Sequence, residues 1–115
     1  MSSKYLRLNG KYLKEAEELL LKHDYPQASE KLWGAFAEVI KAVASKRRVK
    51  PGTHKSIAQY VSNLHNEHPE LRLIDAFKHA ESLHINFYED HLPDDHVMIS
   101  ANVIKQTIDK LKNLL

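Results

Sequence analysis

The chain contains no cysteine, three glycines, four prolines and a single tryptophan among its 115 residues. Without cysteine, disulfide bonds, thiolate-bound zinc and a cysteine nucleophile are excluded. So few glycines and prolines supply little material for turns, which argues against a fold of many short strands. No apolar run approaches the roughly 20 residues that span a bilayer, and the first 25 residues show no signal-peptide pattern. We therefore expect a soluble, cytoplasmic protein with no membrane contact.

The length and composition are typical of one globular domain, which we expect to cover residues 1–115. The hydrophobic fraction is 43% and the charged fraction is 28%, and a chain of this length buries roughly two thirds of its surface on folding. The net charge of +2 is too small to indicate a nucleic-acid-binding protein by itself. The charges are unevenly distributed, however. The segment 46–55 contains no acidic residue and five basic ones: Lys46, Arg47, Arg48, Lys50 and Lys55.

Apolar residues recur at steps of three and four along most of the chain, which predicts amphipathic helices. The expected helices cover residues 3–23, 26–48, 69–93 and 94–115, with a shorter one after Thr53 as its N-cap. Asp94 or Asp95 is expected to cap the last helix. The broad apolar face of 26–48 makes it the central helix. The predicted fold class is all-α, an up-and-down bundle of about five helices, whose core includes Trp33, Phe36, Leu73, Phe77 and Ile104.

His84 lies in the apolar stripe of the fourth predicted helix, between Phe77 and Tyr88, which we also expect to face the core. An ionisable group in such a place is either satisfied by a neighbour or functional. The structural alternative is a neutral imidazole bonded to Glu81 or Tyr88 on the same helix. The functional alternative is a pocket of His84, Tyr88 and His91 that binds a phosphate or a base.

Two segments of the chain resemble a known family. They are the runs Asp24-Tyr25-Pro26-Gln27-Ala28-Ser29-Glu30-Lys31-Leu32-Trp33-Gly34-Ala35 and Leu83-His84-Ile85-Asn86-Phe87-Tyr88-Glu89. With them, residues 19–111 resemble the PaREP family of small archaeal proteins. More distantly, the chain is similar to the HEPN superfamily (higher eukaryote and prokaryote nucleotide-binding domains), through a cap at Thr53-His54-Lys55-Ser56 and a turn at Pro93-Asp94. The resemblance implies a helical bundle that dimerises, with functions from nucleotide or nucleic-acid binding to metal-independent RNA cleavage.

Nuclease members of the HEPN superfamily carry an arginine followed, after four to six residues, by a histidine. Arg72 and His79 fit that spacing, and they would supply a cation for the phosphate and a base for the ribose hydroxyl. On a continuous helix both form one stripe with Asn86 that faces away from the core, so the alternative is a solvated polar face. Arg48 and His54 also fit the spacing, but a Pro-Gly pair between them excludes a shared helix.

The basic segment favours a phosphate-bearing partner. Arg47, Arg48 and Lys55 supply cations, and His54 at the start of a helix can join free backbone amides in an anion site. The alternative is that cations near a helix C-terminus are favoured by the helix macrodipole alone.

The leading hypothesis is a homodimeric, HEPN-like binding module that associates with nucleotide or RNA phosphate, or with a nucleotidyltransferase-type partner protein. One alternative is a metal-independent endoribonuclease, and another is a protein-interaction bundle built on a tetratricopeptide-like helical pair. We expect neither a metal nor a cofactor, and enzymatic activity stays an open question. The apolar stripe along residues 97–115 needs a partner helix, from the same chain or from a second copy.

Overall fold

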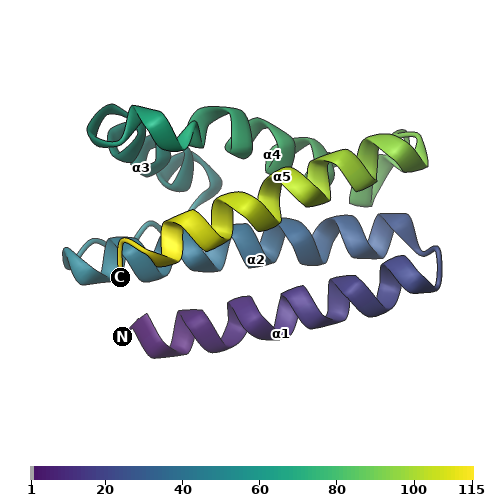
Figure 1. The fold of residues 1–115 in the computed structure, drawn as a ribbon, viewed down its shortest axis with the longest axis horizontal. Coiled ribbons are helices and arrows are strands. Elements are labelled where there is room, and N and C mark those ends of the chain that lie inside the picture. Colours follow the sequence, from purple (N-terminus) through teal and green to yellow (C-terminus); the bar gives the residue numbers. More distant parts are fainter. Residues whose placement is uncertain (1) are drawn as a thin grey trace.

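The structure is a computed structural model that describes residues 2–115, so Met1, which the predicted domain includes, lies outside the described residues. The helices are α1 (Ser2–Leu21), α2 (Tyr25–Lys46), α3 (His54–Glu67), α4 (Leu73–Glu89) and α5 (Asp94–Lys112), with a 3₁₀ turn, η1 (Pro69–Leu71), between α3 and α4 (Figure 1). No strand occurs within the described residues. The predicted all-α bundle of five helices is thus confirmed.

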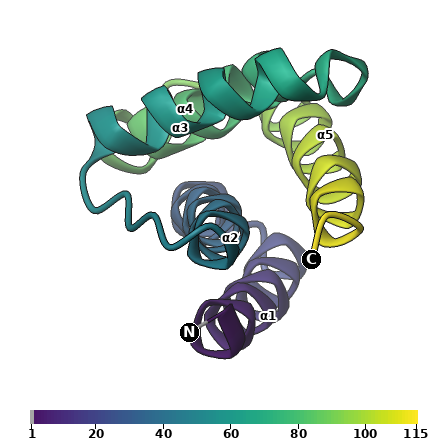
Figure 2. The same cartoon turned by 90° about the vertical axis from the view of Figure 1, so that its left-hand side faces the viewer.

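The second helix, α2, is the centre of the fold, as its sequence predicted. Figure 2 shows α2 nearly end-on, with α1, α5 and the α3–α4 pair around it. Helices α1 and α2 are antiparallel, whereas α3 and α4 run across α2. The core includes Leu32, Phe36 and Ile40 of α2, all fully buried. Alanines on the same helix allow its neighbours to approach closely.

Local sequence signals set two of the helix starts. The side chain of Asp24 accepts a hydrogen bond from the Gln27 amide at 3.3 Å, and a proline follows in the first turn of α2. Thr53 caps α3 by a reciprocal arrangement with Ser56, as predicted for this threonine. The expected cap of α5 by Asp94 or Asp95 is wrong. Both lie in its first turn instead, where the helix dipole favours negative charge.

The predicted continuous helix over residues 69–93 is also wrong. Pro69 opens the separate turn η1, and Arg72 then adopts a left-handed conformation (φ 53°) before α4 begins at Leu73. Helix α4 ends at Glu89, and Asp90, which follows it, is also left-handed (φ 45°). The break leaves Arg72 outside the helix, so the lengthwise stripe of Arg72, His79 and Asn86 does not form.

The buried face of α4 also differs from the predicted one. Leu83 and Asn86 are fully buried, whereas Tyr88, which we expected to face the core, is 71% exposed. The core of α4 follows the stripe Leu73, Ala76, Phe77, Ala80, Leu83 and Asn86. His84 therefore lies at the margin of the core.

The apolar stripe of α5 finds its partner helices within the chain. Val97, Ala101, Ile104, Ile108 and Leu111 are all fully buried there, against α2 and α4. Across residues 2–115, every helix is too short or too polar to span a lipid bilayer.

Candidate functional site

Three aromatic rings from three helices meet at the edge of the core. Trp33 of α2 stacks on the imidazole of His54, the first residue of α3, with ring centroids 4.9 Å apart. It also stacks on His84 of α4 at 5.0 Å, and the two imidazoles are 5.8 Å apart. The structure thus brings together two histidines that the sequence suggested separately as ligand-binding residues.

Each imidazole is held by a carboxylate from another helix. His84 Nδ1 lies 2.7 Å from Glu30 Oε1 on α2, and His54 Nε2 lies 2.9 Å from Glu81 Oε2 on α4. The expected bond of His84 to Glu81 is therefore wrong, because Glu81 pairs with His54. These contacts fix the orientation of both rings, so the stacked arrangement is built before any ligand arrives.

The three rings line a cavity of about 390 Å³ between α2, α3 and α4, which we call the Trp33 cleft. Trp33 was predicted to be a core residue, but it is only partly buried, and it packs against the core from this cleft. The charged residues of the cleft are Glu30, Lys31, Glu38 and Lys41. Lys31 pairs with Glu15 at 3.1 Å, and Lys41 pairs with Glu38 at 3.5 Å.

Two cations of the basic segment are already bonded to other parts of the chain. Arg47 forms a 2.6 Å ion pair with Glu67, and Lys46 donates to the Leu114 and Leu115 carbonyls. The hydrogen bond from Arg47 lowers the pKa of Glu67 and in return raises the pKa of Arg47. Within residues 2–115, the exposed side chains of Arg48, Lys50 and Lys55 form no ion pair.

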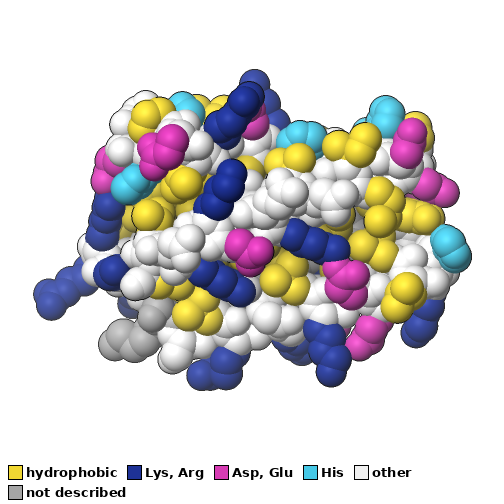
Figure 3. All heavy atoms as spheres, in the orientation of Figure 1, with side chains coloured by type: hydrophobic (Ala, Val, Ile, Leu, Met, Phe, Trp, Pro, Cys, Tyr) yellow, Lys and Arg dark blue, Asp and Glu magenta, His cyan; other side chains and the backbone are white. Residues whose placement is uncertain are grey.

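These three cations lie on or next to the loop that joins α2 to α3. Figure 3 shows Lys and Arg side chains at the end of the molecule where α2 finishes, with acidic and histidine side chains both there and at the end where α4 meets α5. Gly52, Thr53 and His54, from the end of the same loop and the start of α3, line the Trp33 cleft. The free cations and the cleft are therefore neighbours along the chain.

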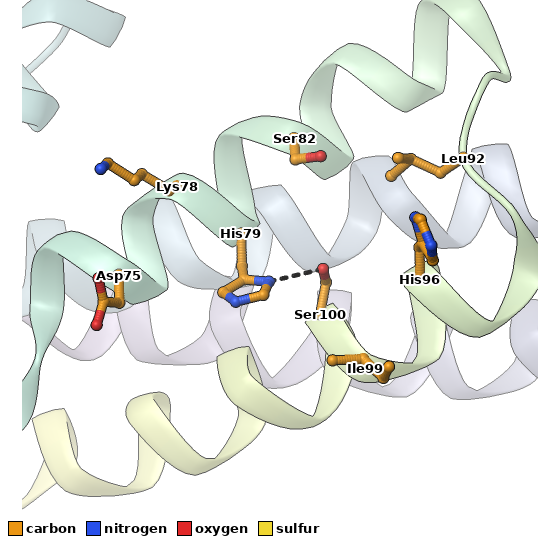
Figure 4. Close-up of a pocket in the computed structure, with 8 residues that line it drawn as sticks. All are labelled: Asp75, Lys78, His79, Ser82, Leu92, His96, Ile99 and Ser100. Atoms are coloured by element: carbon orange, nitrogen blue, oxygen red, sulfur yellow. Dashed lines mark hydrogen bonds between the residues drawn. The ribbon is translucent and has the colours of Figure 1, made fainter.

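Arg72 and His79, the predicted catalytic pair, lie on the opposite side of α4. Arg72 is exposed and pairs with Asp75 at 2.7 Å, which lowers the pKa of that carboxyl. His79 Nδ1 lies 2.8 Å from Ser100 Oγ on α5 (Figure 4). Both predicted residues line a hollow of about 280 Å³, although Asn86, predicted for the same face, is buried.

A larger cavity of about 530 Å³ lies beside this hollow, between α4 and α5. Figure 4 shows its lining: Asp75, Lys78, His79, Ser82, Leu92, His96, Ile99 and Ser100. The aromatic rings that line this cavity are the imidazoles of His79 and His96. That of His79 is already hydrogen-bonded to Ser100. Among the described residues, no three His, Asp or Glu side chains gather closely enough to hold a metal ion.

The predicted pocket of His84, Tyr88 and His91 is only partly assembled. Tyr88 meets His84 edge-on, with ring centroids 5.5 Å apart. The amide of His91 donates to Asn86 Oδ1 at 2.8 Å. In the part of the chain that the structure describes, no ring contact or hydrogen bond joins the His91 side chain to His84 or Tyr88.

Sequence reasoning missed the α2 side of the cleft, although a signal was present. The charged residues Glu30, Glu38 and Lys41, with Gly34 between them, recur at steps of three and four along the central helix. Charged residues at helical spacing on a central helix indicate a face that its neighbours cover only in part. The broad apolar face of the same helix obscured it.

Comparisons with known proteins identify the family. The fold is similar to that of a Sulfolobus solfataricus protein known from a crystal structure, with a TM-score of 0.83, 23% sequence identity, and coverage of 93% of this chain and 95% of that one. At that identity the likeness shows the fold alone. No curated protein matches the chain. The model of the archaeal PaREP1/PaREP8 family matches residues 4–108. As the sequence resemblance indicated, this protein belongs to the archaeal PaREP1/PaREP8 family.

Proposed function

We propose that the protein is a nucleotide-binding module, with the base in the Trp33 cleft and the phosphate at the neighbouring basic loop. The observation that carries this proposal is the cluster of Trp33, His54 and His84 on the wall of a cavity of about 390 Å³. The nucleotide is either free or an unpaired residue of RNA, since both present the same base and phosphate.

The rings of the cleft suit a planar ligand. Bases stack on aromatic side chains and on imidazoles, with about 1–3 kcal/mol lost per base when such a ring is removed. The His54 and His84 rings are held by Glu81 and Glu30, so little ordering is needed on binding. The larger cavity between α4 and α5 lacks an aromatic ring beyond its two imidazoles, which is why we favour the Trp33 cleft.

The start of α3 and its preceding loop suit a phosphate. The capping arrangement uses the amides of Thr53 and Ser56, which leaves the amides of His54 and Lys55 without a partner inside the helix. Amides at a helix N-terminus attract anions. The side chains of Arg48, Lys50 and Lys55, free of ion pairs within residues 2–115, add positive charge beside them.

The single tryptophan provides the test, because Trp33 fluorescence reports on the cleft alone. We expect saturable quenching by nucleoside monophosphates and by short single-stranded RNA. Titrating both separates a free nucleotide from an RNA residue as the preferred ligand. The affinity should fall as salt is raised, since phosphate contacts release counterions.

Alanine variants test the location of the site. His54→Ala and His84→Ala should each weaken binding about tenfold, whereas His96→Ala, in the other cavity, should leave it unchanged. Arg48→Ala with Lys55→Ala should weaken binding and flatten its dependence on salt. If neither nucleoside monophosphates nor RNA quenches the fluorescence saturably, and calorimetry also detects no binding, the proposal is rejected.

Several finer predictions from the sequence stay predictions. They are the HEPN relationship, the homodimer, the protein partner and RNA cleavage by Arg72 and His79. Arg72 and His79 line the same hollow, so RNA cleavage by this pair can be tested. For the ribonuclease alternative, labelled RNA incubated with the protein and a chelator should be cut, and the cut should be lost in Arg72→Ala and His79→Ala. Quenching without cutting would leave the binding module as the better description.

A further inference from the structure

We infer that the base which the Trp33 cleft prefers is guanine, and that Glu30 reads its hydrogen-bonding edge. This inference rests on the proposed function, and it names the ligand for which that site is built. It depends on which polar groups of the cleft already have a hydrogen-bond or ion-pair partner within the protein and which have none.

Glu30 lies at the edge of the stacked rings. Its Oε1 is 2.7 Å from His84 Nδ1, and a hydrogen bond to a ring nitrogen lies close to the plane of the ring. Because His84 in turn stacks on Trp33, a base lying parallel to these rings would bring its edge, rather than its face, toward this carboxylate.

The second oxygen of Glu30 is open to a ligand. Within residues 2–115, Oε2 of Glu30 has no hydrogen-bond partner, and the side chain is 30% exposed. Glu38 differs, because its Oε1 pairs with Lys41 and its Oε2 is sealed from solvent. Glu30 is therefore the carboxylate of the cleft that can accept from a ligand.

The cations of the cleft are already occupied. Lys31 pairs with Glu15 and lies over the Tyr12 ring, 5.3 Å from its centroid, and Lys41 pairs with Glu38. A base that enters the cleft therefore meets the unpartnered Oε2 of Glu30, whereas each cation already has a carboxylate beside it.

Guanine is the base whose edge suits a carboxylate. Its N1–H and N2–H groups point the same way, so a carboxylate can accept from both. Adenine and cytosine place a ring nitrogen lone pair beside their amino group, and uracil places its N–H between two carbonyl oxygens. Those lone pairs would face the charge of Glu30 and be repelled. Since a hydrogen bond to a charged group is worth about 1.5–3 kcal/mol, each donor lost should weaken binding about tenfold or more.

The first experiment compares four monophosphates on the unaltered protein, using Trp33 fluorescence and calorimetry. GMP should bind most tightly, and IMP, which lacks the 2-amino group, about tenfold less tightly. AMP and UMP should bind at least as weakly as IMP. Equal affinities for the four would overturn the guanine assignment and leave the nucleotide-binding module intact. Binding by none of them would overturn both.

The second experiment locates the specificity. Glu30→Gln keeps an oxygen that can accept from His84 but removes the charge, so the preference of GMP over AMP should disappear. Glu81→Gln is the matched control, since Glu81 also holds an imidazole but does not line the cleft. It should keep the preference. Circular dichroism verifies that both variants are folded. A preference for GMP that survives Glu30→Gln would overturn the role of Glu30.

Discussion

At the scale of single residues, Asn86 shows how a buried amide can determine a local structure. Its Oδ1 accepts from the amides of His91 and Leu92, both at 2.8 Å, and its Nδ2 donates to Ser29 Oγ at 3.1 Å. The Ser29 hydroxyl donates to the Tyr25 carbonyl. One fully buried side chain therefore joins the turn after α4 to the start of α2.

Replacing Asn86 with alanine should cost about 2–3 kcal/mol of unfolding free energy, because the buried amides and Ser29 lose their partner. Urea unfolding followed by circular dichroism measures this loss. Asn102→Ala, on the exposed face of α5, is the control and should change stability by less than about 0.5 kcal/mol. Equal stability of the two variants would contradict the structural role of Asn86.

At the scale of elements, two glycines differ in what surrounds them. A Cβ at Gly10 of α1 would meet no atom within 4 Å, whereas a Cβ at Gly34 of α2 would lie 3.0 Å from Cδ2 of the Tyr12 ring. Gly34 therefore allows the close approach of α1 to α2, and it also lines the Trp33 cleft. Gly10 has no such role in the packing of the helices.

The same substitution at the two glycines should therefore have different effects. Gly10→Ala should raise the unfolding free energy by about 1 kcal/mol, since glycine is a poor helix former. Gly34→Ala gains the same free energy from its higher helix propensity, but the Tyr12 ring must move, which costs about 1–3 kcal/mol. Thermal unfolding should place Gly10→Ala above Gly34→Ala in Tm. The reverse order would show that the Tyr12 ring can move aside without loss of stability.

At the scale of the whole molecule, ion pairs join helices that are separated along the chain. Arg47 beyond α2 pairs with Glu67 at the end of α3, and Lys105 of α5 pairs with Glu17 of α1. The hydrogen bond from Arg47 lowers the pKa of Glu67 from its ordinary 4.5, and the bond from Arg72 lowers that of Asp75 from 3.8. Both carboxylates are thus stabilised in their charged form by folding.

Stability should consequently fall in acid. A carboxylate with a lowered folded pKa contributes stability that is complete above its unfolded pKa and is lost as the pH falls through the folded value. The Tm should therefore decline as the pH falls below 4.5, the ordinary value for Glu67. Glu67→Gln should melt earlier than the unaltered protein at neutral pH, and the difference should vanish at low pH. A difference that does not depend on pH would exclude the ion pair as its cause.

The sequence alone determined the helices and most of their starts. Apolar residues at steps of three and four decide helix type locally, and Thr53 and Asp24 act on amides within their own first turns. The family was also evident, from the runs at residues 24–35 and 83–89. These signals are short-range, so they can be recognised without knowing how the chain packs.

The tertiary structure decided where the site lies. The buried stripe of α4 continues from Ala80 through Leu83 to Asn86, so packing against α2 and α5 buries Asn86 and leaves Tyr88 exposed. Trp33, His54 and His84 come from three helices, and their spacing along the chain carries no sign that they stack. Such a cluster depends on how helices cross, because packing between distant segments, and not helix propensity, determines which faces are left uncovered.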